Sequence, residues 1–233
     1  MPIPLYSIKN LHIKIGKEEQ LQINQFDIHR GACYVLAGPM GSGKTTFLDT
    51  LYSRRKIEKS KIRFEEKDIH KYSDGTYQDQ IAVVPQKFSP PWGSVENYIC
   101  KTIRRYPQIK NQSKRLNEIV HKMNISNLLT RKIKNLTPGE MRWVVIAAQI
   151  AADTKVLFID EYEQHLGKED IKTLNNVLYR KIHFDGITLI TSTQDKDHLS
   201  RLASVIITLN KGRITSLRSF SKKKDNYRNK RRK

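Results

Sequence analysis

Cysteine and long apolar runs are both scarce in this chain of 233 residues. Only Cys33 and Cys100 occur, with no CxxC pair or cysteine–histidine spacing, so the pattern excludes a disulfide framework and a zinc site. No stretch approaches the roughly 18 to 20 consecutive apolar residues that a membrane span needs. The first residues also lack the charged-then-apolar order of a secretion signal. We therefore expect a cytoplasmic protein in which both cysteines are packing residues.

Acidic residues are few as well, since 23 Asp and Glu stand against 43 Lys and Arg, giving a formal net charge of +20. Residues 222–233 hold eight of the basic residues and a single acidic one, Asp225. This basic tail is expected to be disordered when free, and its charge is typical of segments that contact anionic lipid. For the remaining chain two interpretations stay open, a lysine-rich surface solvated by water and a surface for an anionic partner.

Five short apolar runs are typical of strands buried on both faces of a parallel sheet. They are residues 32–37, 81–84, 155–159, 187–190 and 205–209. Helical stretches separate most of these runs, beginning with Lys44 to Leu51, so the sequence predicts an α/β core. The opening segment, residues 5–28, alternates apolar and polar residues as an exposed antiparallel sheet would.

The region from about residue 89 to 153 has no strand-like run. Apolar residues recur there at helical spacing over 95–103 and 116–123, and a further helix is predicted for 141–152. We therefore expect one domain over residues 1–221 with an inserted helical lobe at about 89–153, followed by the basic tail.

A glycine-rich loop between the first apolar run and the following helix predicts a phosphate-binding site. It consists of Gly38, Pro39, Met40, Gly41, Ser42, Gly43, Lys44 and Thr45. Its glycines let several backbone N–H groups face the phosphates, and the positive end of the helix dipole points at them. Lys44 is expected to contact the β- and γ-phosphates, Thr45 to place its hydroxyl on Mg²⁺, and Thr46 to complete the site. The flanking strand and helix disfavour the alternative of an ordinary glycine-rich turn.

Two acidic residues, Asp160 and Glu161, follow the apolar run 155–159. Open α/β sheets bind their ligands at the C-terminal ends of their strands. We expect Asp160 to hold the Mg²⁺ shell and Glu161 to act as the general base for water attack on the γ-phosphate. Two acids after a strand are also a common turn signal, but the phosphate loop favours the catalytic interpretation.

From residue 5 to 216 the sequence resembles the nucleotide-binding subunits of ATP-binding cassette (ABC) proteins. Gln86 stands at the family's glutamine loop, residues 136–140 (LTPGE) at its signature, and Gln194 at its switch histidine. The resemblance implies a P-loop NTPase core with a mostly parallel sheet, an N-terminal antiparallel β subdomain and an inserted helical subdomain. It also implies that Gln86 touches Mg²⁺ and the attacking water.

The signature segment has two interpretations. The resemblance implies that Thr137 and Gly139 approach the nucleotide bound by a second subunit. The same residues also make a good helix start, with Thr137 as N-cap, Pro138 at the first helical position and Glu140 at the third. The family interpretation is favoured, because the following helix, residues 141–152, leads into the acidic strand at the distance expected for the family.

Several positions depart from the family's pattern. Ile15 stands where an aromatic ring usually stacks on adenine, so the preference for ATP rests on the resemblance. Pro138 removes one N–H from the signature. The Gln194 amide can bond the γ-phosphate but cannot carry charge, and Gly167 replaces an aspartate that contacts the second subunit. The sequence therefore predicts intact binding of ATP and Mg²⁺ with slow hydrolysis.

Three functions follow from the resemblance. The first is the motor of a membrane complex, in which two copies, or one copy and a related ATPase, drive a transmembrane partner at the inner face of the membrane. The loop, the Glu-ending signature and residues 185–188 look most like the cell-division ATPase FtsE and its lipoprotein-release relatives, with a solute transporter as the alternative. The second is an ATP-gated regulatory module with negligible turnover. The third, a nucleic-acid-associated ATPase, is disfavoured by the single cassette and the few aromatics in the tail.

Overall fold

The structure, a computed structural model, describes residues 3–15, 18–52, 57–73, 75–89 and 91–220. The strands in this part are β1 (Tyr6–Ile15), β2 (Glu18–Ile28), β3 (Cys33–Ala37), β4 (Ile62–Phe64), β5 (Lys67–Asp68), β6 (Ile81–Val84), β7 (Val156–Ile159), β8 (Thr188–Ser192), β9 (Val205–Asn210) and β10 (Arg213–Ser219). The α-helices are α1 (Lys44–Leu51), α2 (Val95–Arg104), α3 (Gln112–Met123), α4 (Pro138–Ala151) and α5 (Lys168–His183). Short 3₁₀ helices are η1 (Ile69–Lys71), η2 (Gln78–Gln80), η3 (Ser126–Leu128), η4 (Ile133–Asn135) and η5 (Lys196–Leu199).

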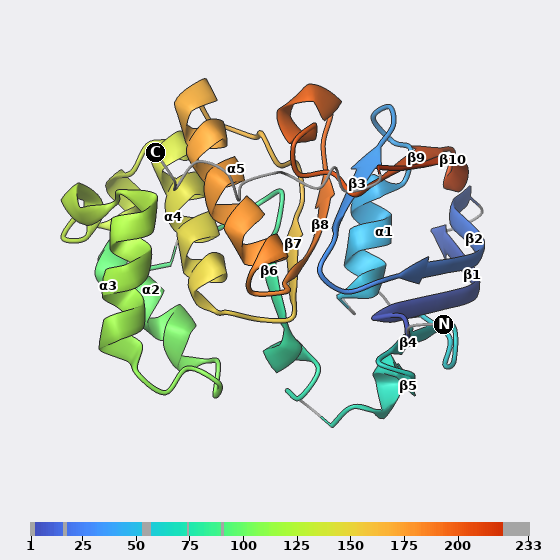
Figure 1. Cartoon of the computed structure of the whole chain (residues 1–233), viewed down its shortest axis with the longest axis horizontal. Coiled ribbons are helices and arrows are strands. Elements are labelled where there is room, and N and C mark those ends of the chain that lie inside the picture. Colours follow the sequence, from blue (N-terminus) through green and yellow to red (C-terminus); the bar gives the residue numbers. More distant parts are fainter. Residues whose placement is uncertain (1–2, 16–17, 53–56, 74, 90, 221–233) are drawn as a thin grey trace, which may run out of the picture.

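One sheet runs through the molecule with the strand order β5-β4-β1-β2-β10-β9-β3-β8-β7-β6. Strands β1, β2, β4 and β5 lie at one end, and helices α2 to α5 gather around the other end (Figure 1). This is a mixed α/β fold, as the sequence predicts. Within the described residues, no helix has both the length and the apolar character needed to cross a membrane.

The parallel part of the sheet confirms the five strands predicted from apolar runs. Strands β9, β3, β8, β7 and β6 lie side by side and pair in parallel. Alternate residues of β3 lie in two hydrophobic cores, one on each face of the sheet. Cys33 and Val35 belong to the core with helices α2 to α5, and Tyr34 and Leu36 belong to the core with α1. Both faces are therefore covered, which is why these strands are apolar throughout rather than alternating.

The opening segment forms the predicted antiparallel pair, β1 with β2, with an irregularity between Ile13 and Lys14. The expectation of an exposed sheet was wrong for one of its faces. Ile8 and Leu11 are buried in the core beneath α1, while Lys9 and His12 are exposed. Strand β2 also pairs in parallel with β10, so this hairpin is continuous with the nucleotide core.

The predicted helical lobe is confirmed by α2, α3 and α4. Among the described residues of 89–153 the strand-like feature is an isolated bridge between Ser94 and Lys132. The Ser94 and Asn111 side chains cap α2 and α3 by accepting backbone N–H bonds of 3.2 and 2.9 Å. Helix α4 is buried on most of its circumference, because it lies between the sheet and the other helices of the lobe. The domain limit at residue 221 and the basic tail lie outside the described residues.

Candidate functional site

The predicted phosphate-binding loop connects the end of β3 to the start of α1. Gly38 and Gly43 have φ values of 143° and 103°. A Cβ on them would lie 2.2 Å from the Leu209 carbonyl oxygen and 2.9 Å from the Gln20 carbonyl oxygen, distances that only glycine avoids. A Cβ on Gly41, by contrast, would meet no atom within 4 Å. The loop is therefore pressed against the protein on one side and open on the other.

Lys44 is the first residue of α1, and only 9% of its surface is exposed. Its Nζ donates hydrogen bonds of 2.7 and 2.9 Å to the carbonyl oxygens of Gly38 and Pro39. Burial lowers the pKa of Lys44, and the carboxylates of Glu161 and Asp160 counteract that shift. Because an ammonium has three N–H donors, Lys44 can bind a phosphate oxygen while still attached to the loop.

The hydroxyl groups of the loop supply a test of whether it fits a phosphate chain. The Ser42 Oγ is buried and has no hydrogen-bond partner among the described residues. A buried hydroxyl without a partner is costly, and a phosphate oxygen cradled by the loop would satisfy it. Thr45 in the first turn of α1 is exposed, whereas Thr46 is buried. The residues present fit a bound triphosphate.

The predicted acidic pair lies where β7 and β8 end side by side. The Ser192 Oγ donates to the Asp160 carboxylate and accepts a 2.7 Å hydrogen bond from the Glu161 backbone N–H. Asp160 is only 2% exposed, whereas Glu161 is partly exposed. Glu161 has a φ of 52°, in the left-handed region that residues other than glycine rarely adopt. This sharp turn gives the two adjacent carboxylates different surroundings.

Gln194, at the predicted switch position, lies beside Glu161. Its Nε2 donates a 3.3 Å hydrogen bond to the Glu161 Oε1. The loop around Gln194 is held by Glu163, a residue that the motifs did not single out. Glu163 accepts hydrogen bonds from the Gln194 N–H (2.7 Å) and from the Thr193 Oγ1 (2.8 Å). Two carboxylates from the loop after β7 therefore fix the loop after β8.

Gln86 follows β6, whose last residue, Val84, pairs with Ile159 at the end of β7. Gln86 and Asp160 therefore begin their loops at the same edge of the sheet. Together with Thr45 they offer amide, carboxylate and hydroxyl oxygens, which are ligands that suit Mg²⁺. The described residues contain no cluster of three or more His, Cys, Asp and Glu for a metal. This donor set fits an ion that takes its remaining ligands from phosphate and water.

The signature segment begins α4 with a complete capping box. The Thr137 Oγ1 accepts from the Glu140 N–H (3.2 Å), and the Glu140 Oε2 accepts from the Thr137 N–H (2.8 Å). Arg131 donates a further 2.6 Å hydrogen bond to Glu140. A Cβ on Gly139 would lie 2.8 Å from the His165 carbonyl oxygen. Contacts within the chain therefore suffice to explain this helix start, whatever a second subunit adds.

Arg142 in α4 is the second residue that the motifs missed. Only 6% of its surface is exposed. It donates to the carbonyl oxygens of Pro85 (2.6 Å), Asp160 (2.6 Å) and Glu161 (3.0 Å). Burial lowers its pKa to about 10, so the guanidinium keeps its charge at neutral pH. No local pattern marks this residue, apart from its being a charge next to the apolar run 143–148.

Two predicted features cannot be placed. The side chain of Ile15 and the basic tail lie outside the described residues.

Gly167, at the position of the family aspartate, is the N-cap of α5, and its N–H donates a 3.1 Å hydrogen bond to the Asp170 Oδ2.

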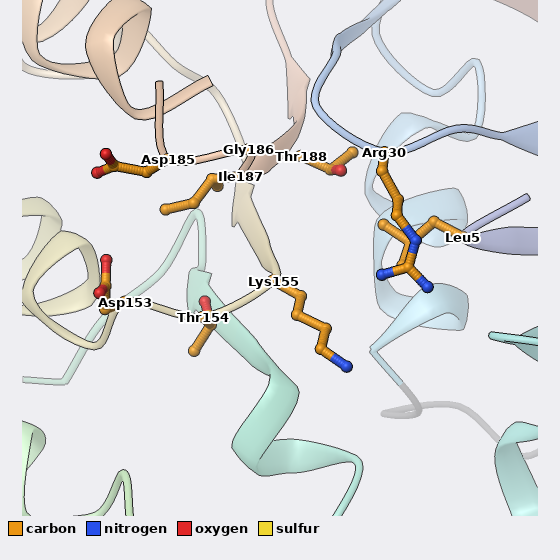
Figure 2. A pocket seen from close by; sticks show the side chains of 9 residues that line it. All are labelled: Leu5, Arg30, Asp153, Thr154, Lys155, Asp185, Gly186, Ile187 and Thr188. Atoms are coloured by element: carbon orange, nitrogen blue, oxygen red, sulfur yellow. The ribbon is translucent and has the colours of Figure 1, made fainter. Parts of the chain in front are cut away.

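A polar hollow of about 200 Å³ lies at the opposite edge of the sheet, where β7 and β8 begin (Figure 2). Its charged side chains are already paired. Arg30 and Lys155 contact Glu65 at 2.7 and 2.9 Å, and Asp153 and Asp185 both contact Lys181. Because these charged groups are already paired, the phosphate loop remains the candidate site.

The fold, together with the phosphate loop and the acidic pair at the C-terminal ends of the strands, defines a P-loop nucleotide-binding ATPase. The sequence profile of the ABC transporter family matches residues 21–164, more than half of the chain, so the chain belongs to the ABC transporter family. By class it is therefore an ATP-binding subunit and an ATP hydrolase of the ABC type.

Two curated relatives illustrate the range of this family. The chain is 29% identical over 221 residues to the spermidine/putrescine import ATP-binding protein PotA of Clostridium novyi, covering 91% of this chain but only 61% of that protein. It is 23% identical over 220 residues to the lipoprotein-releasing system ATP-binding protein LolD of Leptospira interrogans, covering 92% of both.

Solved structures agree on the fold. The dimeric ATP-binding cassette MJ0796, in a post-hydrolysis state bound to ADP and Pi, matches with a TM-score of 0.81 and 21% identity, over 93% of this chain and 99% of that one. The structure of cbiO1 from Clostridium perfringens, part of the ABC transporter complex cbiONQ, matches with a TM-score of 0.79 and 21% identity, over 94% of this chain and 89% of that one.

Proposed function

We propose that this chain is the ATP-binding motor subunit of a membrane ABC complex, in which two cassettes close on two ATP molecules and separate after hydrolysis. The observation that carries the proposal is the phosphate loop. It combines a glycine cradle with a buried, unpartnered Ser42 hydroxyl and the Lys44 ammonium. A loop with these three properties is built to bind phosphate rather than to turn the chain.

Each residue near the γ-phosphate has a role in the proposed hydrolysis. Mg²⁺ held by Thr45, Asp160 and Gln86 would neutralise charge on the β- and γ-phosphates. Glu161 accepts the proton of the attacking water. The Gln194 amide bonds the Glu161 carboxylate through one N–H, which leaves its second N–H for the γ-phosphate.

We also expect slow turnover, because of the residue types at the switch and signature positions. A neutral amide stabilises the negative charge that develops on the γ-phosphate less than an imidazolium does. Pro138 also offers no N–H from the signature to a nucleotide in a second subunit. We therefore expect Thr137 and Gly139 to contribute to a closed dimer less than the loop residues 38–46 contribute to binding.

The proposal extends to the membrane partner and to the cellular process that the complex serves. The helical lobe passes closure to a transmembrane subunit at the inner face of the membrane, and the second cassette is another copy or a related ATPase. A cell-envelope role of the FtsE or lipoprotein-release kind is preferred, which the likeness to LolD supports. The likeness to PotA supports a solute transporter instead. A neighbouring reading frame with four spans and a large external domain would favour the envelope role, and one with six spans the transporter.

Phosphate release tests the motor against an ATP-gated module. The wild type and Glu161→Gln would be compared, each alone and with the membrane partner. The motor predicts that wild-type release exceeds that of the variant and rises with the partner. Equal rates in both settings would leave only the ATP-gated module, and an absent signal in an ATP titration would contradict the proposal.

Lipid contact by the basic tail is a separate part of the proposal. Binding to vesicles that contain anionic lipid would be compared between the full chain and a chain lacking residues 222–233. Each basic residue near an anionic surface contributes roughly 1 kcal/mol. Unchanged vesicle binding by the shortened chain would overturn this role for the tail.

A further inference from the structure

Arg142 occupies an unusual place for a charged side chain. It lies in the second turn of α4, among residues that are otherwise apolar and buried. Its hydrogen-bond acceptors are three backbone carbonyls rather than a carboxylate, and its Nε has no partner among the described residues. Burying a guanidinium carries a large desolvation cost, which an apolar residue at this position would avoid. The charge therefore calls for an explanation beyond packing.

The carbonyls that Arg142 holds belong to the two motifs on which hydrolysis depends. The Pro85 carbonyl lies in the peptide unit that leads into Gln86, so fixing this oxygen fixes the plane of that unit. The carbonyls of Asp160 and Glu161 belong to the acidic turn after β7. One guanidinium thus spans two segments that are 57 and 18 residues away from it in sequence.

Glu161 needs such support because its backbone is strained. A φ of 52° is unfavourable for a residue with a side chain and persists only where the surroundings enforce it. The Glu161 N–H is held by the Ser192 Oγ at 2.7 Å, and its carbonyl by the Arg142 Nη2 at 3.0 Å. Held at both ends, this residue keeps its carboxylate beside the Gln194 amide.

We propose that Arg142 is a positioning residue for ATP hydrolysis, which fixes Glu161 and the entry to Gln86 and ties both to α4. Helix α4 starts within the signature at Pro138, four residues before Arg142, or roughly 6 Å along the helix. A shift of the signature towards a second subunit therefore moves the carbonyls of both motifs together. Arg142 in this way links closure of the dimer to the orientation of the general base.

The test uses Arg142→Lys, which keeps a positive charge but loses the planar fork that reaches three carbonyls. The matched control is Arg115→Lys in α3. Arg115 also donates to backbone carbonyls of α4, those of Ile150 and Ala151, but far along the helix from the site. Both variants are measured as the full chain, with a melting curve to confirm folding.

The inference predicts that Arg142→Lys lowers kcat by about tenfold to a hundredfold while KM and ATP affinity stay within about twofold, because misplacing a general base affects the chemical step. Arg115→Lys should change kcat by less than about twofold. An unchanged kcat for Arg142→Lys, or a loss equal to that of Arg115→Lys, would overturn the inference.

A second measurement, hydrogen exchange, tests the inference even if wild-type turnover is negligible. Hydrogen exchange should speed up by about tenfold in residues 84–88 and 159–164 of Arg142→Lys, and instead near residues 150–153 of Arg115→Lys. Unchanged exchange at 84–88 and 159–164 would overturn the inference. The kinetic part rests on the proposed function, which fails separately if the wild type binds no nucleotide.

Discussion

The loop half of the site, residues 38–46, differs in construction from the closing half, residues 136–140, 161–167 and 193–195. In the loop half the buried Ser42 hydroxyl has no hydrogen-bond partner among the described residues, so a bound ligand would supply its missing hydrogen bond. In the closing half Thr137 and Glu140 hydrogen-bond to each other, and Glu163 accepts a hydrogen bond from the backbone N–H of Gln194. A second subunit must therefore compete with bonds inside the chain. This difference in construction is a physical reason for the slow turnover that we propose for a chain with a complete nucleotide loop.

The largest expected effect comes from Lys44→Ala in the loop half. Losing a charge-assisted hydrogen bond to phosphate should weaken ATP binding by about 30- to 100-fold in a calorimetric titration. Lys155→Ala, at the opposite edge of the sheet, is the control and should leave affinity within about twofold. If both variants bind as well as the wild type, the loop half is not the binding site.

Restoring a histidine tests the closing half. Gln194→His should raise the rate of phosphate release by about tenfold, because an imidazolium beside Glu161 stabilises charge on the γ-phosphate. The rate should also acquire a pH dependence near the usual histidine pKa of about 6.5, with the faster rate below it. An unchanged rate with a flat pH profile would show that the switch position does not limit turnover.

The sequence predicts the loop half well because one continuous segment encodes it. Helix α1 begins at Lys44 and ends at Leu51 as predicted, and the apolar runs mark the parallel strands. The closing half is harder to predict, because its contacts join distant segments. Glu163 meets the loop at Gln194, 31 residues away, and nothing in the local pattern of either segment indicates that contact. The roles of all these site residues, those of the loop and the acidic pair as well as those of Gln86 and the signature, remain predictions.

Glycine at position 139 separates two explanations of the signature. If Gly139 is needed only by a second subunit, Gly139→Ala should not affect the isolated chain. The 2.8 Å approach of a Cβ to the His165 carbonyl oxygen predicts instead a loss of roughly 1 to 3 kcal/mol, or a melting temperature lower by about 2 to 12 °C without nucleotide. Gly167→Ala is the control, since its φ of −77° and a 3.4 Å contact with Asp170 are ordinary. Equal melting of the two variants would favour the second-subunit explanation.

The smallest effect concerns Glu140, the last residue of the signature. The Thr137 backbone N–H and the Arg131 guanidinium hold the pKa of Glu140 below its usual value of 4.5. A lowered carboxyl pKa stabilises the fold above the usual value, and that stability is lost as the pH falls through the lowered one. Glu140→Gln keeps the capping bond but not the charge, so its melting temperature should be about 1 to 3 °C below wild type at pH 7. The difference should shrink as the pH falls below the usual value and through the lowered pKa, because the wild-type carboxylate is then protonated. Glu169→Gln, an exposed first-turn glutamate of α5, is the control and should show neither change. A Glu140→Gln deficit that persists unchanged at low pH would mean that charge does not hold the signature in place.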